Sequence, residues 1–187
     1  MSQFEYLSVL VSIIVGLGIS HLLSSTARLI QVRRHIRFHA PTLFWMGFLL
    51  LVQVQVWWVA FARRTVTEWQ FFVFLLYLFI PVGVFLLSYL IVPDLREAKE
   101  IDLRASYHEN RLWLYGIFAL VVVTSLANES VEAGVIPTNL DALLRLGFLG
   151  LALVGLLFRG ERVHFAASLA ILVGFIAYVL LLFIRLA

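Results

Sequence analysis

Four residues in the first apolar stretch and one in the second could bind an ion or a small polar solute. Four of these residues share one face of a predicted helix, because they are spaced by three, four and three residues: Gly18, His21, Ser25 and Arg28. The imidazole of His21 titrates near neutral pH and can donate and accept hydrogen bonds. Gln53 adds an amide that also does both. We expect these five residues to line an ion or solute path. The alternative is that His21 and Gln53 only hydrogen-bond neighbouring helices.

Four further histidines could take part in a metal site. The histidines are His35, His39, His108 and His164, and either Glu109 or Glu161 could complete the ligand set. A spacing of four residues would bring His35 and His39 to one side of a helix, and imidazole and carboxylate groups bind zinc. Ordinary surface side chains give the same pattern, and a bis-histidine haem needs ligands on facing helices. We therefore expect no metal and no cofactor. A histidine metal or haem enzyme is the remaining alternative.

The composition of the chain is that of a membrane protein. Its 187 residues are 63% hydrophobic and 13% charged, and the mean hydropathy is +1.00, whereas a soluble domain carries about 25% charged residues. The expected fold is all-α integral membrane, with residues 1–187 in a single polytopic transmembrane domain. The sequence has no cysteine, which excludes disulfides, iron–sulfur clusters and thiolate metal ligands.

Six apolar segments are long enough to cross a bilayer. A transmembrane helix needs about 20 apolar residues to span about 30 Å of hydrocarbon. The predicted segments are Leu7–Gln31, Pro41–Ala62, Trp69–Val92, Leu112–Asn128, Leu140–Phe158 and His164–Leu186. The first has neither a basic leader region nor a small-residue cleavage pattern, so we expect it to remain as a helix of the protein.

The loop between the third and fourth segments predicts a short interfacial amphipathic helix. Pro93 ends the third segment, and Asp94 and Glu97 suit the first turn of a new helix that runs to about Ala105. Its apolar face would consist of Leu95, Ala98, Ile101 and Ala105. The opposite face would carry Arg96, Glu97, Lys99, Glu100 and Arg104. Such a helix lies in the membrane surface.

Three local signals concern the other helices. Pro81 lies inside the third segment and predicts a kink there. Thr138, with Asp141 three residues later, predicts the start of the fifth helix. Arg145 follows Asp141 by four residues, so the two charges should form an ion pair on one helical face.

Small residues recur every fourth position in the first segment and again in the sixth. They are Ser8, Ser12, Gly16, Ser20 and Ser24 in the first segment, and Ala166, Ala170 and Gly174 in the sixth. Lipid provides no hydrophobic drive for helix association, so close packing at small side chains must supply it. We expect these residues to pack helices together, and we expect the protein to form a homo-oligomer.

Basic residues are divided unequally between the two sets of loops. Ten of the 14 lysines and arginines lie at the first, third and fifth loops. The positive-inside rule then places both termini outside the cytoplasm, in a bacterial inner membrane. The expected partners are the bilayer and anionic lipid headgroups at the cytoplasmic loops. The net charge of +3 follows from this topology and gives no reason to expect nucleic acid.

These features predict a homo-oligomeric channel or transporter for an ion or small polar solute, with a polar path along the first helix. The alternative is a membrane-embedded sensor or accessory subunit that docks a partner protein through the small-residue stripe and the basic third loop. An enzyme that uses the histidine group is the least favoured of the three alternatives.

Overall fold

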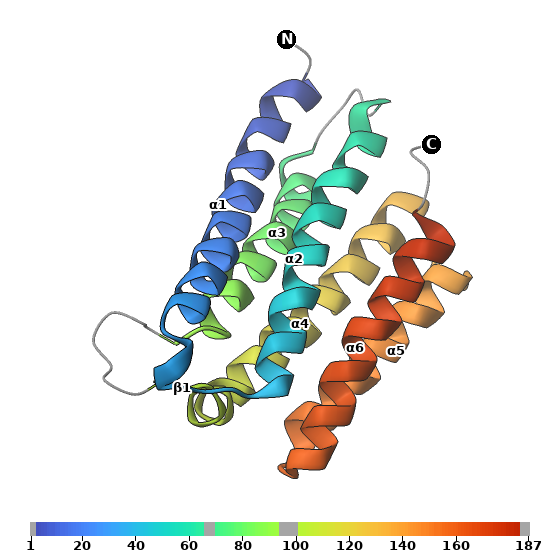
Figure 1. The fold of residues 1–187 in the computed structure, drawn as a ribbon. Helices are drawn as coiled ribbons and strands as arrows, with labels where there is room; N and C mark the ends of the chain where they lie inside the picture. Colours follow the sequence, from blue (N-terminus) through green and yellow to red (C-terminus); the bar gives the residue numbers. More distant parts are fainter. Residues whose placement is uncertain (1–2, 66–69, 94–100, 184–187) are drawn as a thin grey trace.

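Six long α-helices make up the described part of the chain. The computed structural model describes residues 3–65, 70–93 and 101–183. The helices are α1 (Gln3–Gln31), α2 (Ala40–Ala60), α3 (Phe71–Leu90), α4 (Leu103–Ala133), α5 (Leu140–Leu157) and α6 (Glu161–Leu182) (Figure 1). Two short 3₁₀ helices, η1 (Arg33–His35) and η2 (Phe61–Thr65), follow α1 and α2. All six α-helices are long and apolar enough to cross a membrane. The predicted all-α membrane fold is confirmed at this level.

Helix α4 is much longer than the predicted segment 112–128. It begins after Asp102, whose carboxylate accepts hydrogen bonds from the backbone N–H groups of Arg104 (2.9 Å) and Ala105 (3.1 Å). The bond from Ala105 contributes most to holding the pKa of Asp102 below its ordinary value. The helix ends before Gly134, whose φ of 67° is that of a left-handed C-cap. Hydropathy missed the first turns because they are polar.

The interfacial helix predicted between α3 and α4 is wrong over its described residues. A two-residue strand, β2 (Ile101–Asp102), pairs in parallel with β1 (Ile36–Arg37). The next three residues, 103–105, form the first turn of α4. The helical spacing of apolar residues was misleading here, because Ile101 is buried and pairs with another strand instead of facing lipid headgroups. The rest of the predicted helix, residues 94–100, lies outside the described residues.

The start of α5 also differs from its prediction by one residue. Asn139, and not Thr138, is the N-cap, and its side-chain oxygen accepts a hydrogen bond from the backbone N–H of Ala142 at 2.8 Å. Both residue types suit a helix N-cap, so sequence alone does not choose between neighbours.

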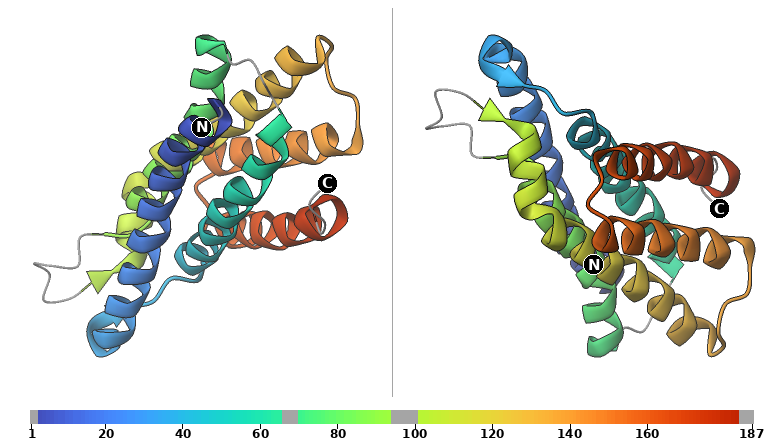
Figure 2. Two further views of the ribbon diagram at one scale, coloured as in Figure 1. Left: turned by 90° about the horizontal axis from the view of Figure 1, so that it is seen from above. Right: turned by 90° about the horizontal axis from the view of Figure 1, so that it is seen from below.

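The helices form a closed ring in which each packs against its neighbour on either side. The order around the ring is α1, α3, α4, α5, α6 and α2, and α2 also contacts α3 and α4 across it. Seen from above and from below, α1 and α3 lie on one side and α5 and α6 on the other (Figure 2). Helix α1 begins and α6 ends at the same end of the bundle, which we call the terminal end (Figure 1). We call the opposite end the loop end.

The small-residue stripe of α1 lies on the outside of the bundle. The buried face of α1 carries, at alternating spacings of four and three, Val11, Val15, Gly18, Leu22, Ser25 and Leu29. Ser8 is half-buried, and exposed positions are occupied by Ser12, Gly16, Ser20 and Ser24. In α6 the side chains of Ala166 and Ala170 are also exposed, whereas Gly174 is half-buried beside Phe148. A packing role for these stripes between chains stays a prediction.

Candidate functional site

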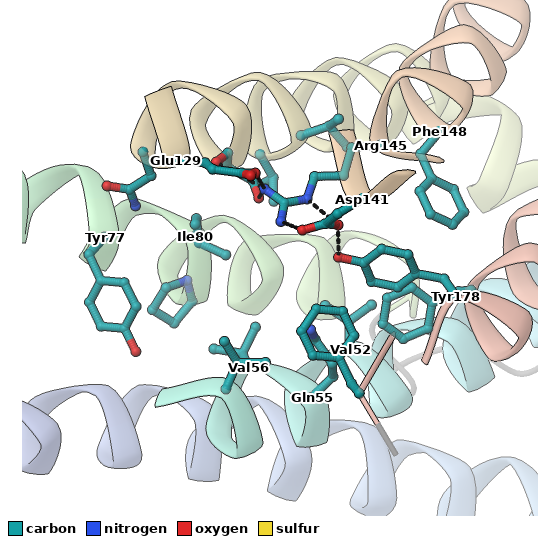
Figure 3. Close-up of a pocket in the computed structure, with 18 of the residues that line it drawn as sticks. Val52, Gln55, Val56, Tyr77, Ile80, Glu129, Asp141, Arg145, Phe148 and Tyr178 are labelled. Atoms are coloured by element: carbon teal, nitrogen blue, oxygen red, sulfur yellow. Dashed lines mark hydrogen bonds and ion pairs between the residues drawn. The ribbon is translucent and has the colours of Figure 1, made fainter. Parts of the chain in front are cut away.

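A cavity of about 290 Å³ lies inside the terminal end of the bundle. Its walls come from α2, α3, α4, α5 and α6, and include Pro81, through which α3 continues without ending. Most of the lining is aromatic or aliphatic. The polar lining residues are Gln55, Arg63, Tyr77, Ser125, Asn128, Glu129, Glu132, Asp141, Arg145 and Tyr178. Figure 3 shows Glu129, Asp141 and Arg145 gathered on one wall, across the cavity from α2.

Arg145 is the centre of a charged network on this wall. Its Nε donates to Oδ1 of Asp141 at 3.0 Å, and its Nη2 pairs with the other oxygen, so the predicted ion pair is confirmed. Its Nη1 lies 3.0 Å from Oε2 of Glu129 and donates to the hydroxyl of Ser125 at 3.1 Å. Tyr178 of α6 donates to Oδ1 of Asp141 at 2.7 Å. The guanidinium of Arg145 thus pairs with carboxylates from α4 and α5, and the hydroxyl of Tyr178 connects α6 to the same network (Figure 3).

The charged residues that line the cavity, which include a second ion pair, leave an excess of negative charge. Arg63 pairs with Glu132, and its guanidinium carbon lies 4.5 Å from the centre of the Tyr77 ring. The described lining therefore contains two arginines and three carboxylates, a formal net charge of −1. A cleft with low-dielectric walls and one sign of excess charge attracts ions of the opposite sign.

The amide of Asn128 is a buried part of the wall that lacks hydrogen bonds. Asn128 is 2% exposed, and neither its Nδ2 nor its Oδ1 has a hydrogen-bond partner in the described part of the chain. Leaving a buried polar group unsatisfied costs about 1–3 kcal/mol. Asn128 is among the residues that line the cavity, so a small rotation of its side chain would present this unused amide to a molecule inside.

Aromatic rings form a floor between the cavity and the loop end. Trp45 of α2 meets Tyr115 and Phe118 of α4 edge to face, and Phe48 of α2 meets Phe118 in the same way, with ring centres 5.2–5.4 Å apart. Phe48 also meets Phe175 of α6, at 5.2 Å. Such edge-to-face geometry is favourable between aromatic quadrupoles. Trp45 and Tyr115 are fully buried, so the floor is closely packed.

Tyr115 of the floor also belongs to a network of four buried polar side chains, and the other three lie below the floor. The hydroxyl of Tyr107 is 2.8 Å from that of Tyr115, 3.1 Å from Nδ1 of His164 and 3.4 Å from the hydroxyl of Ser168. Nε2 of His164 is 3.0 Å from the carbonyl oxygen of Phe158. A carbonyl only accepts, so Nε2 donates, and Nδ1 of the neutral ring accepts from a tyrosine. This network joins α4 to α6.

Gly155 makes room for the network on the side of α5. A Cβ atom at this position would lie 2.2 Å from the Tyr115 ring, so a larger residue would displace it. The guanidinium of Arg111 donates to the carbonyl oxygens of Gly155 (3.3 Å) and Phe158 (2.6 Å). These bonds satisfy carbonyls that the end of a helix leaves without intrahelical partners.

At the loop end, two of the predicted histidines meet one glutamate. Nε2 of His39 lies 2.7 Å from Oε1 of Glu161, and Nε2 of His108 lies 3.0 Å from Oε2. The ligand atoms of these three residues all lie within 4.8 Å of one another. Nε of Arg104 also donates to Oε2 of Glu161, at 3.0 Å.

The other residues of the predicted histidine group lie apart from this cluster. His35 is exposed in η1 and His39 caps α2, so the two do not share a helical face as their spacing suggested. Glu109 is exposed on α4. His164 is bonded within the network below the floor.

Three of the five predicted path residues meet where α1 packs against α2 and α3. Gln53 is fully buried, and its Nε2 donates to the hydroxyl of Ser88 at 3.4 Å. Gly18 allows this approach, because a Cβ there would lie 2.0 Å from Nε2 of Gln53. His21 stacks on Tyr89, with ring centres 3.7 Å apart.

Of the remaining two residues on α1, Ser25 is buried and Arg28 is exposed. None of the five lines the terminal-end cavity. A path along α1 therefore stays a prediction that is separate from the cavity.

Sequence reasoning found Asp141 and Arg145 as a local pair but did not connect this pair to Asn128 and Tyr178. The available signal was polar side chains at the ends of three apolar segments, since such residues are costly in a membrane unless they are paired or functional. Only the tertiary structure shows that they face one space.

Comparisons of the chain with protein-family models, with curated proteins and with solved structures find no match.

Proposed function

We propose that this protein is a transporter for a small polar solute, that the terminal-end cavity binds the solute, and that the solute is an amine with an apolar body. The observation that carries this proposal is the unpartnered amide of Asn128 in a wall that also contains Glu129. An ammonium group would donate to the amide oxygen, and its charge would balance the excess negative charge of the lining. Aromatic side chains suit the apolar body and attract the cation through their faces.

The floor favours a carrier over a permanently open pore. The rings of Trp45 and Tyr115, and then the network around His164, fill the space between the cavity and the loop end. A solute that enters from the terminal end must therefore wait for a rearrangement of these side chains or of their helices. Alternation between two such conformations is how transporters move a solute past a central site.

A partner-docking subunit is the second candidate, and the exposed small-residue stripe of α1 favours it. The stripe also suits the homo-oligomer of the transporter proposal, because small side chains allow close helix contacts between chains. Native mass spectrometry of protein released from mild detergent separates these cases. A homo-oligomer supports the transporter, and a defined complex with a different protein supports the docking subunit.

Benzylammonium tests the cavity, because it combines one ring with one N–H cation. We expect saturable binding to the wild-type protein in isothermal titration calorimetry. Asn128→Leu should weaken binding about tenfold, because one buried hydrogen bond is worth about 1.4 kcal/mol.

The matched control is Asn110→Leu, which removes an amide from the same helix at the loop end, where it donates to the carbonyl of Leu90. This variant should bind benzylammonium as the wild type does. Benzoate, with the same ring and the opposite charge, should not bind. Equal affinity of wild type and Asn128→Leu for benzylammonium would refute the assignment of the cavity as an amine site.

A further inference from the structure

The cluster of His39, His108 and Glu161 joins the N-terminal ends of three helices at the loop end. His39 is the N-cap of α2, His108 lies in the second turn of α4, and Glu161 is the first residue of α6. Each offers one ligand atom, and these atoms all lie within 4.8 Å of one another. The cluster is at the opposite end of the bundle from the cavity, and it plays no part in the proposed amine binding.

Second-sphere bonds orient His39 toward the other two residues. Its Nδ1 lies 3.0 Å from the hydroxyl of Thr42, which in turn donates to the carbonyl oxygen of Leu103 at 3.4 Å. The hydroxyl therefore accepts from Nδ1–H, and Nε2 is the nitrogen left to face Glu161. Metal-binding histidines are held in this manner, with the second ring nitrogen donating to a fixed oxygen. His39 is 5% exposed, and Thr42 is fully buried.

Nε2 of His39 and Nε2 of His108 each face an oxygen of Glu161, at 2.7 and 3.0 Å. In the His39 tautomer fixed by Thr42, Nε2 carries no hydrogen, so this nitrogen and the carboxylate oxygen need a proton or a metal ion between them. Zinc holds nitrogen and oxygen ligands at about 2.0–2.2 Å, so tetrahedral ligand atoms lie roughly 3.4 Å apart. His108 and Glu161 are partly exposed and can rotate to close the set to this size.

The geometry points to a binding site for a divalent transition metal of the zinc class, with Nε2 of His39, Nε2 of His108 and one carboxylate oxygen of Glu161 as ligands. Two imidazoles and one carboxylate suit Zn²⁺ and its first-row neighbours rather than Mg²⁺ or Ca²⁺, which prefer all-oxygen sites. Three protein ligands leave a fourth position for water. The partial exposure of Glu161 places that position toward solvent.

Arg104 would compete with the metal ion for the carboxylate of Glu161. Its Nε donates to Oε2 of Glu161, and its side chain is 62% exposed, so it can swing into solvent when an ion binds. A cation beside the site opposes the binding of a second cation. The metal site therefore predicts that removing the arginine strengthens metal binding, which a purely structural histidine–glutamate pair does not predict.

Titration of the chelator-treated full-length protein in detergent with Zn²⁺ alone tests this site. We expect one equivalent to bind. His108→Ala and Glu161→Gln should each weaken binding by about 100-fold or more, and Thr42→Val, which removes only the orienting hydroxyl, by about 10–100-fold. His35→Ala is the matched control, because His35 is an exposed histidine on the same loop and should leave affinity unchanged. Arg104→Gln should bind Zn²⁺ more tightly than the wild type.

Co²⁺ provides a second measurement, because its visible absorption reports the ligand set directly. The wild type should give a spectrum of nitrogen and oxygen coordination that His108→Ala abolishes and His35→Ala preserves. Absence of stoichiometric Zn²⁺ binding would overturn the assignment, as would equal affinities in the wild type, His108→Ala and Glu161→Gln. The amine-binding assay at the cavity is independent of this result.

Discussion

Replacement of Arg145 by leucine is expected to lower the free energy of unfolding by about 3 kcal/mol, because removal of one member of a largely buried ion pair leaves the remaining charge uncompensated. Here two carboxylates lose their partner, Asp141 and Glu129. The Arg145 side chain is only 17% exposed, so water replaces the guanidinium poorly. Unfolding of the detergent-solubilised protein by a denaturing surfactant measures the loss.

Neutralising the carboxylates should restore much of this loss. We expect the triple variant Arg145→Leu, Asp141→Asn, Glu129→Gln to be more stable than Arg145→Leu alone, because the interaction energy of contacting residues is not additive. Arg162→Leu is the control, since Arg162 is exposed at the loop end. A loss for Arg145→Leu no larger than that for Arg162→Leu would show that the network does not stabilise the bundle.

Gly155→Ala is expected to have the second largest effect, a loss of about 1–3 kcal/mol from overpacking. The added methyl group would lie 2.2 Å from the Tyr115 ring, which is fully buried between Trp45 and the hydroxyl network. Either the ring or α5 must move. Unfolding measurements give the energy, and near-ultraviolet circular dichroism reports whether the aromatic floor is disturbed.

Gly150→Ala is the matched control in the same helix. A Cβ atom at Gly150 meets nothing within 4 Å in the described structure. This substitution should be neutral or stabilising by up to about 1 kcal/mol, because alanine is the better helix former. Equal stability of the two alanine variants would contradict the close contact between Gly155 and Tyr115.

The sequence was sufficient to predict the number and approximate position of the membrane helices, because length and hydropathy decide which segments can cross a bilayer. It was also sufficient for the pair Asp141–Arg145, since a spacing of four residues determines a contact within one helix. Both inferences depend on residues that are near one another in the chain.

Contacts between helices could not be predicted in the same way. Periodicity places Gly18, His21 and Ser25 on a polar stripe, but the structure uses Gly18 to accommodate Gln53 from α2. The network around Arg145 draws on α4, α5 and α6, and the histidine cluster draws on α4, α6 and the N-cap of α2. The spacing of four residues would bring His35 and His39 together only within one helix. Strand β1 lies between them instead, so they do not share a helical face.

Cysteine accessibility in proteoliposomes is the measurement that decides whether the cavity opens at the terminal end and is closed by the aromatic floor. The chain has no cysteine, so a single introduced thiol reports without background. Val122 lines the cavity, and Ser168 lies in the network below the floor. A membrane-impermeant maleimide added on the side of the chain termini should modify Val122→Cys and not Ser168→Cys, and benzylammonium should slow the modification. Modification of both cysteines at similar rates, or of neither, would contradict a solute cavity that is open at the terminal end and closed below.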